Sequence, residues 1–170
     1  MLPGMAADLN RVHSTPSWLV IGYGNSLRRD DGAGLLLAAS VAADMAAAGV
    51  PVRLVQVQQL APELAEEIAA PHVGGVIFVD TIPARTAADT LQITPLGEED
   101  AATAQSSSHH VGPALLLRMA AQLFGHAPAA WLVTVPGWDF GHGEELSPST
   151  RAQLARAAAV WPHVRRQADL

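Results

Sequence analysis

Three side chains in this 170-residue sequence have the chemistry and the spacing to bind a divalent cation. Asp31 lies in the glycine-rich turn GYGNSLRRDDGAG (residues 22–34), Asp80 follows the apolar run GGVIFV, and His109 is the last residue but one of the polar segment EEDAATAQSSSHH. Loops at the carboxyl ends of adjacent parallel strands meet in one crevice, so residues far apart in the chain can converge there. Asp, Asp and His would form a mixed oxygen and nitrogen site that suits a divalent transition metal and leaves coordination positions open.

Each of these side chains also has a simpler interpretation. Asp30 and Asp31 stand where a helix is expected to begin, so they could cap it and interact with the positive end of its dipole. Asp80 could cap a helix or hold a loop, although a carboxylate next to such an apolar run is costly to bury without a partner. His110 is adjacent to His109 and could serve in its place. The metal site is therefore a hypothesis, with helix capping as the alternative.

The glycine-rich turn does not match a phosphate-binding loop. A dinucleotide fingerprint needs G-x-G-x-x-G, but the turn reads GYGNSL, and the next predicted strand, VRLVQVQQL, carries no acidic residue for a ribose. The chain has no lysine, which excludes a Walker loop, and no G-x-S-x-G motif, which argues against a serine hydrolase. Carboxylates at this turn favour a cation over a phosphate.

The elements that must position these residues alternate between apolar runs and helical segments, the pattern of an α/β fold with a largely parallel sheet. The run 74–82 is typical of a central strand covered on both faces. The segment 89–97 follows it after a short connection and is predicted to be antiparallel. Ser147 caps one last helix that runs to about Arg166. The predicted strands are 17–23, 52–60, 74–82, 89–97 and 129–137, and the predicted helices are 33–48, 62–70, 113–125 and 148–166.

Length and composition indicate one domain and exclude several classes of protein. The residues are 49% hydrophobic, enough for one core over 17–166, with residues 1–16 as a flexible N-terminal extension. The net charge is −6 and the ten basic residues are scattered arginines, so no nucleic acid partner is expected. Without cysteine there is no disulfide, thiolate zinc site or cysteine nucleophile. No apolar run is long enough to insert into a membrane, and we expect a cytoplasmic monomer.

Four motifs together resemble the hydrogenase maturation endopeptidases, which process the large subunit of nickel–iron hydrogenases. These are GYGNSLRRDDGAG, VDTIPA, SSHHVGPALLL and LSPSTRAQL, and the resemblance runs from about Trp18 to Val164. It implies a three-layer α/β/α sandwich with a mostly parallel, five-stranded twisted sheet. Many relatives carry E-P or Q-P after the penultimate strand, whereas this chain reads VTVPGWDFGHG, so no acid or amide is expected to act there.

The resemblance also implies a function and a site. Asp31 falls on the acidic residue that closes the pattern GN-x-L-x-x-D-[DE], Asp80 on the aspartate after the central strand, and His109 on the histidine of the H-x-x-G element. In the family this triad is both the metal site and the catalytic site: it senses nickel already inserted in the hydrogenase precursor, whose C-terminal extension is then cleaved. The nickel is thus supplied by the substrate, and zinc or cadmium could occupy the same ligands.

Around this triad, residues of the glycine-rich turn are candidates for substrate binding. Gly24 lets the backbone approach the precursor, and Asn25 holds the turn or donates to a substrate carbonyl. Arg28 grips acidic or carbonyl groups of the precursor, unless Arg28 and Arg29 instead form surface ion pairs with Asp30. A nucleotide- or metabolite-binding module and a non-catalytic nickel-binding chaperone remain the alternative functions.

Overall fold

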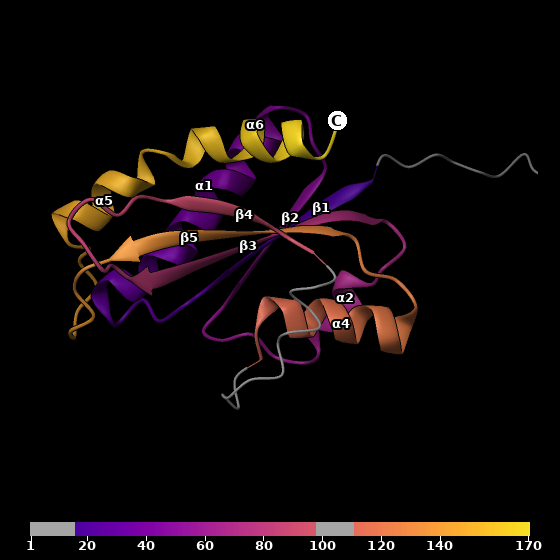
Figure 1. The fold of residues 1–170 in the computed structure, drawn as a ribbon, viewed down its shortest axis with the longest axis horizontal. Coiled ribbons are helices and arrows are strands. Elements are labelled where there is room, and N and C mark those ends of the chain that lie inside the picture. The colour runs from indigo at the N-terminus through magenta and orange to yellow at the C-terminus, as the bar shows by residue number, and fades with distance from the viewer. Residues whose placement is uncertain (1–15, 98–110) are drawn as a thin grey trace, which may run out of the picture.

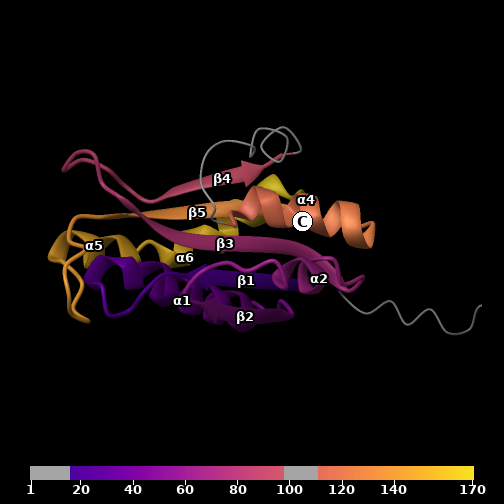
Figure 2. The same ribbon diagram turned by 90° about the horizontal axis from the view of Figure 1, so that it is seen from below.

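The computed structural model describes residues 16–97 and 111–170, and within them five strands form one twisted sheet in the order β2-β1-β3-β5-β4. Helices cover both faces of this sheet (Figures 1 and 2), so the predicted three-layer α/β/α sandwich is confirmed. The predicted N-terminal extension falls almost wholly on residues 1–15, outside the described part. The strands are Ser17–Tyr23 (β1), Val52–Val57 (β2), Val73–Pro83 (β3), Gln92–Leu96 (β4) and Ala129–Gly137 (β5). The helices are Arg29–Gly32 (η1, a 3-10 turn), Ala33–Ala47 (α1), Leu64–Ile68 (α2), Pro113–Phe124 (α4), Pro148–Leu154 (α5) and Ala157–Gln167 (α6).

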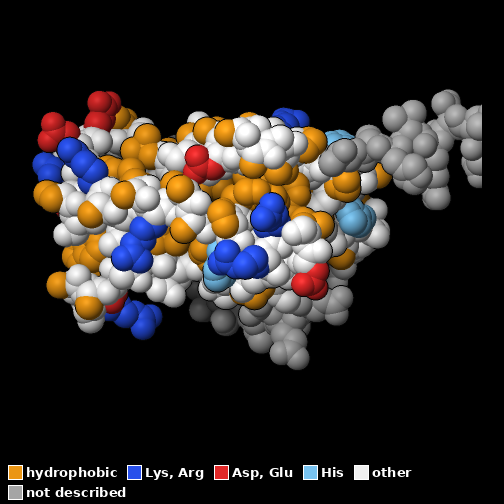
Figure 3. Space-filling model, turned by 90° about the horizontal axis from the view of Figure 1, so that it is seen from above, with side chains coloured by type: hydrophobic (Ala, Val, Ile, Leu, Met, Phe, Trp, Pro, Cys, Tyr) orange, Lys and Arg blue, Asp and Glu red, His pale blue; other side chains and the backbone are white. Residues whose placement is uncertain are grey.

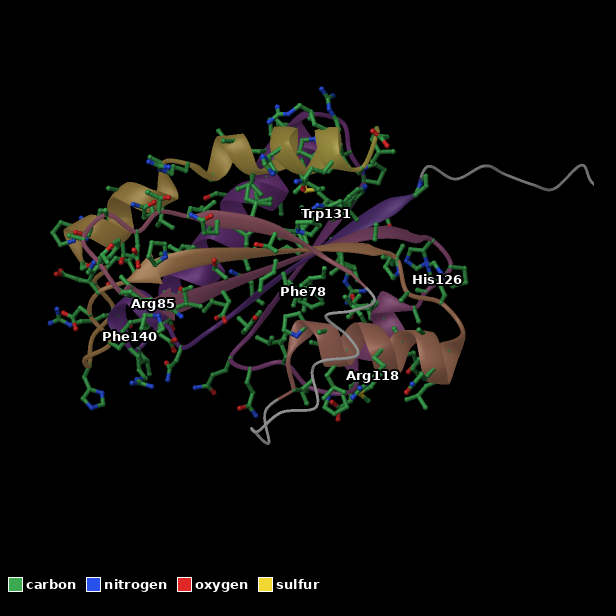
Figure 4. All side chains as sticks on the ribbon, viewed as in Figure 1. Phe78, Arg85, Arg118, His126, Trp131 and Phe140 are labelled. Carbon is green, nitrogen blue, oxygen red and sulfur yellow. The ribbon has the colours of Figure 1, made fainter. Side chains whose placement is uncertain are left out.

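The central strand β3 is largely apolar because both of its faces are covered. It pairs in parallel with β1 on one side and with β5 on the other. Side chains that alternate along a strand point to opposite faces. Phe78 accordingly packs in the core under α2 and α4, whereas Ile77 and Val79 pack under α1 and α6. Figure 4 places Phe78 on the α4 side and Trp131 of β5 on the α6 side.

The antiparallel direction predicted for β4 is correct, but its neighbour is β5 and not the preceding strand β3. Both edges of β3 are occupied by β1 and β5, so β4 cannot pair with β3 and lies instead on the outer edge of β5. A turn closed by the Asp89 carboxylate, which accepts from Arg85 N at 2.7 Å and Thr86 Oγ1 at 2.6 Å, starts this return. The sheet is therefore mostly parallel with one antiparallel edge.

The last predicted helix is two helices. Ser147 caps the first as expected, its Oγ accepting from Thr150 N at 3.3 Å, and Pro148 occupies the first helical position. The first helix, α5, ends at Leu154, and the second, α6, begins at Ala157 and packs on α1. No glycine or proline marks the break, so the prediction of one continuous helix to Arg166 was wrong for want of a local signal.

The outer surface over α5 and α6 carries basic side chains scattered among apolar and acidic ones (Figure 3). Within residues 16–97 and 111–170, none of the helices combines the length and the apolar character that crossing a membrane requires.

Candidate active site

Asp80 and Tyr23 emerge side by side at the carboxyl edge of the sheet. The parallel register pairs Gly22 of β1 with Val79 of β3, which places the next residue of each strand together at that edge. The Tyr23 side chain forms a hydrogen bond with Asp80, and Thr81 N donates to Asp80 Oδ1 at 2.8 Å. The register of two buried strands thus fixes the position of this carboxylate.

Asp31 reaches the same edge from the 3-10 turn η1 that follows β1. Its Oδ2 accepts from Asn25 N at 2.9 Å, which holds the carboxylate against the glycine-rich turn. Gly24 is required for this arrangement, because it has φ +143° and a Cβ there would lie 2.1 Å from the Asp31 carbonyl oxygen. Neither Asp30 nor Asp31 caps α1, whose N-cap is Gly32 without a side-chain hydrogen bond, so the capping alternative is wrong.

The structure brings Asp31 and Asp80 together in one pocket of about 350 Å³. The loop after β2 and Val111, just before α4, also line it. Its lining residues are Tyr23, Gly24, Asp31, Gln58, Gln59, Leu60, Ala61, Pro62, Asp80 and Val111. Residues from the ends of β1, β2 and β3 therefore meet here, as expected for the crevice of an open α/β sheet.

The two carboxylates repel each other in a partly desolvated setting. Burial raises the pKa of Asp80 to about 6, and the charge of Asp31 adds to the rise, while hydrogen bonds from Thr81 N and Tyr23 oppose it. Burial, together with the charge and the hydrogen bond of Asp80, raises the pKa of the Tyr23 phenol above its ordinary value. A cation between Asp31 and Asp80 would relieve this repulsion.

His109 and His110 lie outside the described residues. Val111, two positions after His109, lines the pocket. Among the described residues, no three His, Asp or Glu side chains gather in a way that could hold a metal ion. The contribution of His109 to a triad with Asp31 and Asp80 therefore stays a prediction.

The substrate-binding candidates lie around the rim of the turn. Gly24 lines the pocket, and Asn25 holds the turn through its Oδ1, which accepts from Leu27 N at 2.9 Å. Arg28 is exposed, with its Nη2 3.5 Å from the carbonyl oxygen of Phe140. Their contact with a substrate stays a prediction.

The suggested ion pairs of Arg28 and Arg29 with Asp30 are wrong. Asp30 is fully buried and binds backbone amides and hydroxyl groups instead. Arg29 pairs with Asp139, Nη1 to Oδ2 at 2.8 Å, because the turn directs Arg29 outward and Asp30 inward.

Sequence reasoning missed Tyr23 and the polar residues Gln58 and Gln59 as parts of the site. Tyr23 could have been found from the strand register, because it ends the strand that pairs beside Asp80. Both glutamines were predicted to belong to the strand 52–60, but β2 ends at Val57, and they follow it at the carboxyl edge of the sheet.

The protein is thus an α/β/α sandwich with a mostly parallel sheet, and two carboxylates lie in the crevice at the carboxyl edge of that sheet. No protein-family model matches the sequence, and no curated protein matches it. Several solved structures, however, are similar to this chain in fold. The hydrogenase maturating endopeptidase HybD from E. coli is 22% identical with a TM-score of 0.65, over 89% of this chain and 93% of that chain.

Two archaeal structures give the same result. The hydrogenase maturation protease HycI from Thermococcus kodakarensis is 19% identical with a TM-score of 0.65, over 88% of this chain and 92% of that chain. HybD from the same organism is 21% identical with a TM-score of 0.59, over 87% of this chain and 98% of that chain. The chain thus shares the fold of these maturation proteases along nearly its whole described length.

Proposed function

We propose that this protein is an endopeptidase that removes the C-terminal extension of a nickel–iron hydrogenase large-subunit precursor after nickel insertion. The observation that carries the proposal is the pairing of Asp31 and Asp80 in one pocket at the carboxyl edge of the sheet. The fold shared with HybD and HycI, whose names describe maturation proteases, supports the same reaction.

The donor set fits nickel presented by the substrate. Asp31 and Asp80 offer carboxylate oxygens, and His109, two residues before the pocket residue Val111, offers an imidazole nitrogen. A divalent ion would offset the burial and the repulsion by Asp31 that together raise the pKa of Asp80. Zinc or cadmium suits the same donors and provides a probe that needs no precursor.

Hydrolysis of the scissile peptide needs a base and a polarised carbonyl group. Asp80 is the candidate base, since its carboxylate could accept a proton from the attacking water and pass it to the leaving amine. The substrate's nickel would polarise the carbonyl or acidify a bound water molecule.

The test is removal of the tail from purified, nickel-loaded precursor, followed by intact-protein mass spectrometry. We expect Asp31→Asn, Asp80→Asn and His109→Ala each to slow processing by about a hundredfold or more. Asp44→Asn and His72→Ala are matched controls, since Asp44 and His72 are exposed and do not line the pocket. Both controls should process the precursor at the wild-type rate.

The outcomes separate the competing functions. Nickel binding without tail removal by the wild-type protein would indicate a chaperone. Tight binding of NAD or ATP without cleavage would indicate a nucleotide-binding module. Wild-type processing by all three site variants would contradict the assignment of Asp31, Asp80 and His109.

A further inference from the structure

Asp30, the neighbour of Asp31, is a fully buried carboxylate that takes no part in the pocket. All of its side-chain partners lie more than 100 residues away, between the end of β5 and the first turn of α5. Oδ2 accepts from Trp138 N at 2.8 Å, Asp139 N at 2.9 Å, Ser147 Oγ at 2.7 Å and Thr150 Oγ1 at 2.8 Å, and Oδ1 accepts from Ser147 N at 2.7 Å.

These hydrogen bonds keep Asp30 ionised inside the protein. Burial raises the pKa of its carboxyl group, but the hydrogen bonds from Ser147, Thr150 and Asp139 outweigh burial and lower the pKa below its ordinary value. The backbone adds a reciprocal bond, from Asp30 N to Asp139 O at 3.0 Å. Residues 138–147 are here called the β5–α5 loop. The turn and this loop thus bind each other through both the side chain and the backbone N–H of Asp30.

Arg29 shows that this turn is held under strain. It has φ +46°, a left-handed conformation that is unfavourable for a residue with a side chain. Its N–H donates to Gly143 O at 2.8 Å, its Nε to His142 O at 3.1 Å, and its Nη1 to Asp139 Oδ2 at 2.8 Å. Every one of these partners belongs to the β5–α5 loop, so the loop maintains the conformation of the turn.

The loop lies at the end of the molecule where β3 and β5 terminate; Phe140, one of its residues, is labelled there in Figure 4. Successive residues of a 3-10 turn point in directions about 120° apart. Asp30 therefore faces the β5–α5 loop, while Asp31 faces the pocket and accepts from Asn25 N. Any shift of the turn that loosens Asp30 moves the Asp31 carboxylate.

We propose that Asp30 is a positioning residue, which clamps the β5–α5 loop to the turn and thereby fixes the Asp31 carboxylate in the pocket. The inference rests on the proposed function for its effect on catalysis. Its structural part concerns only the place of Asp31 and can be measured without a substrate.

The hydrogen bonds between Asp30 and residues 138–150 are here called the clamp. The test uses two clamp variants, Asp30→Asn and Thr150→Val. In Asp30→Asn, the asparagine directs its NH₂ group at an N–H donor in either orientation of its amide. Thr150→Val removes one donor and changes neither Asp30 nor Asp31. Val160→Ala is the stability control, because Val160 is fully buried on the inner face of α6 and lies outside the clamp. All proteins are compared at a temperature at which each is fully folded.

Two quantities are measured. The first is the NMR shift of the Asn25 amide, which donates to Asp31 Oδ2. The second is kcat and KM for the nickel-loaded precursor. We expect the clamp variants to move the Asn25 proton resonance upfield and to lower kcat about tenfold with little change in KM, since a sub-ångström misplacement carries a cost of that order. Val160→Ala should match the wild type in both quantities.

A purely structural role would be revealed if the clamp variants lost thermal stability as Val160→Ala does but kept the wild-type Asn25 shift and kcat. A displaced Asn25 resonance with wild-type kcat would support the positioning of Asp31 by Asp30 but overturn its effect on catalysis. If the wild-type protein cleaves no precursor, the proposed function fails, and the Asn25 resonance alone decides whether Asp30 positions Asp31.

Discussion

Replacing Asp80 by asparagine should change the way in which the stability of the protein depends on pH. In the folded protein, burial raises the pKa of Asp80 from 3.8 to about 6, with the charge of Asp31 adding to the rise. The unfolded chain removes both causes, so its Asp80 titrates near the ordinary value. The asparagine of the Asp80→Asn variant carries no titrating proton in either state.

The sign follows from proton binding. Between about pH 4 and about pH 6, folded Asp80 holds a proton that unfolded Asp80 has lost, so the free energy of unfolding of the wild type falls as the pH rises. At about 1.4 kcal/mol per pKa unit, the rise from 3.8 to about 6 corresponds to about 3 kcal/mol. About 0.5 kcal/mol of this is already lost at pH 4, so Asp80→Asn should gain about 2.5 kcal/mol relative to the wild type between about pH 4 and about pH 7.

The assay is urea unfolding of both proteins at these two pH values, in the presence of a chelator. Comparing the two proteins at each pH cancels the titration of groups that do not interact with Asp80, including Asp30. Asp31→Asn, made in both backgrounds, should shrink the effect because it removes a repelling charge. Tyr23→Phe should enlarge it, because the Tyr23 hydrogen bond stabilises the Asp80 carboxylate. A difference between wild type and Asp80→Asn that does not vary with pH would refute the reasoning.

Two further predictions concern packing around the site and in the core. Gly24→Ala should lower both thermal stability and precursor processing, because its Cβ would collide with the Asp31 carbonyl oxygen. Gly49→Ala, also at positive φ but with open space around it, should lower stability alone. Melting curves and the mass-spectrometric assay of processing distinguish the two variants. Phe78→Ala should cost about 3–5 kcal/mol in urea unfolding, since Phe78 is fully buried in the central strand, and a loss well under about 1 kcal/mol would contradict that placement.

Local sequence patterns were sufficient to predict most of the fold. The continuous apolar run of β3 and the helical composition of α1 carry their own signals, and the observed bounds Val73–Pro83 and Ala33–Ala47 differ from the predicted ones by no more than one residue at either end. The pairing of β4 with β5 and the break between α5 and α6 were not predictable in this way. They depend on which edges and faces other elements already occupy.

The candidate site was predictable to the extent that it follows from chain order. Asp31 follows β1, and Asp80 lies near the carboxyl end of the adjacent parallel strand β3, so a general rule about α/β sheets brings them together. Asp30 has the same residue type and nearly the same position as Asp31, but its role depends on donors at residues 138–150 that no local pattern connects to it. The place of His109 in the site stays a prediction.

The contrast between the two neighbouring aspartates indicates which of them is available for chemistry. Asp30 receives enough hydrogen bonds to lower its pKa despite burial, so its charge is already compensated within the fold. Asp80 has a raised pKa, because its hydrogen bonds from Thr81 N and Tyr23 do not offset burial and the charge of Asp31. A cationic ligand, as proposed above, would compensate the charge of Asp80. Metal titration should therefore lower the pH at which Asp80 ionises while leaving Asp30 unaffected.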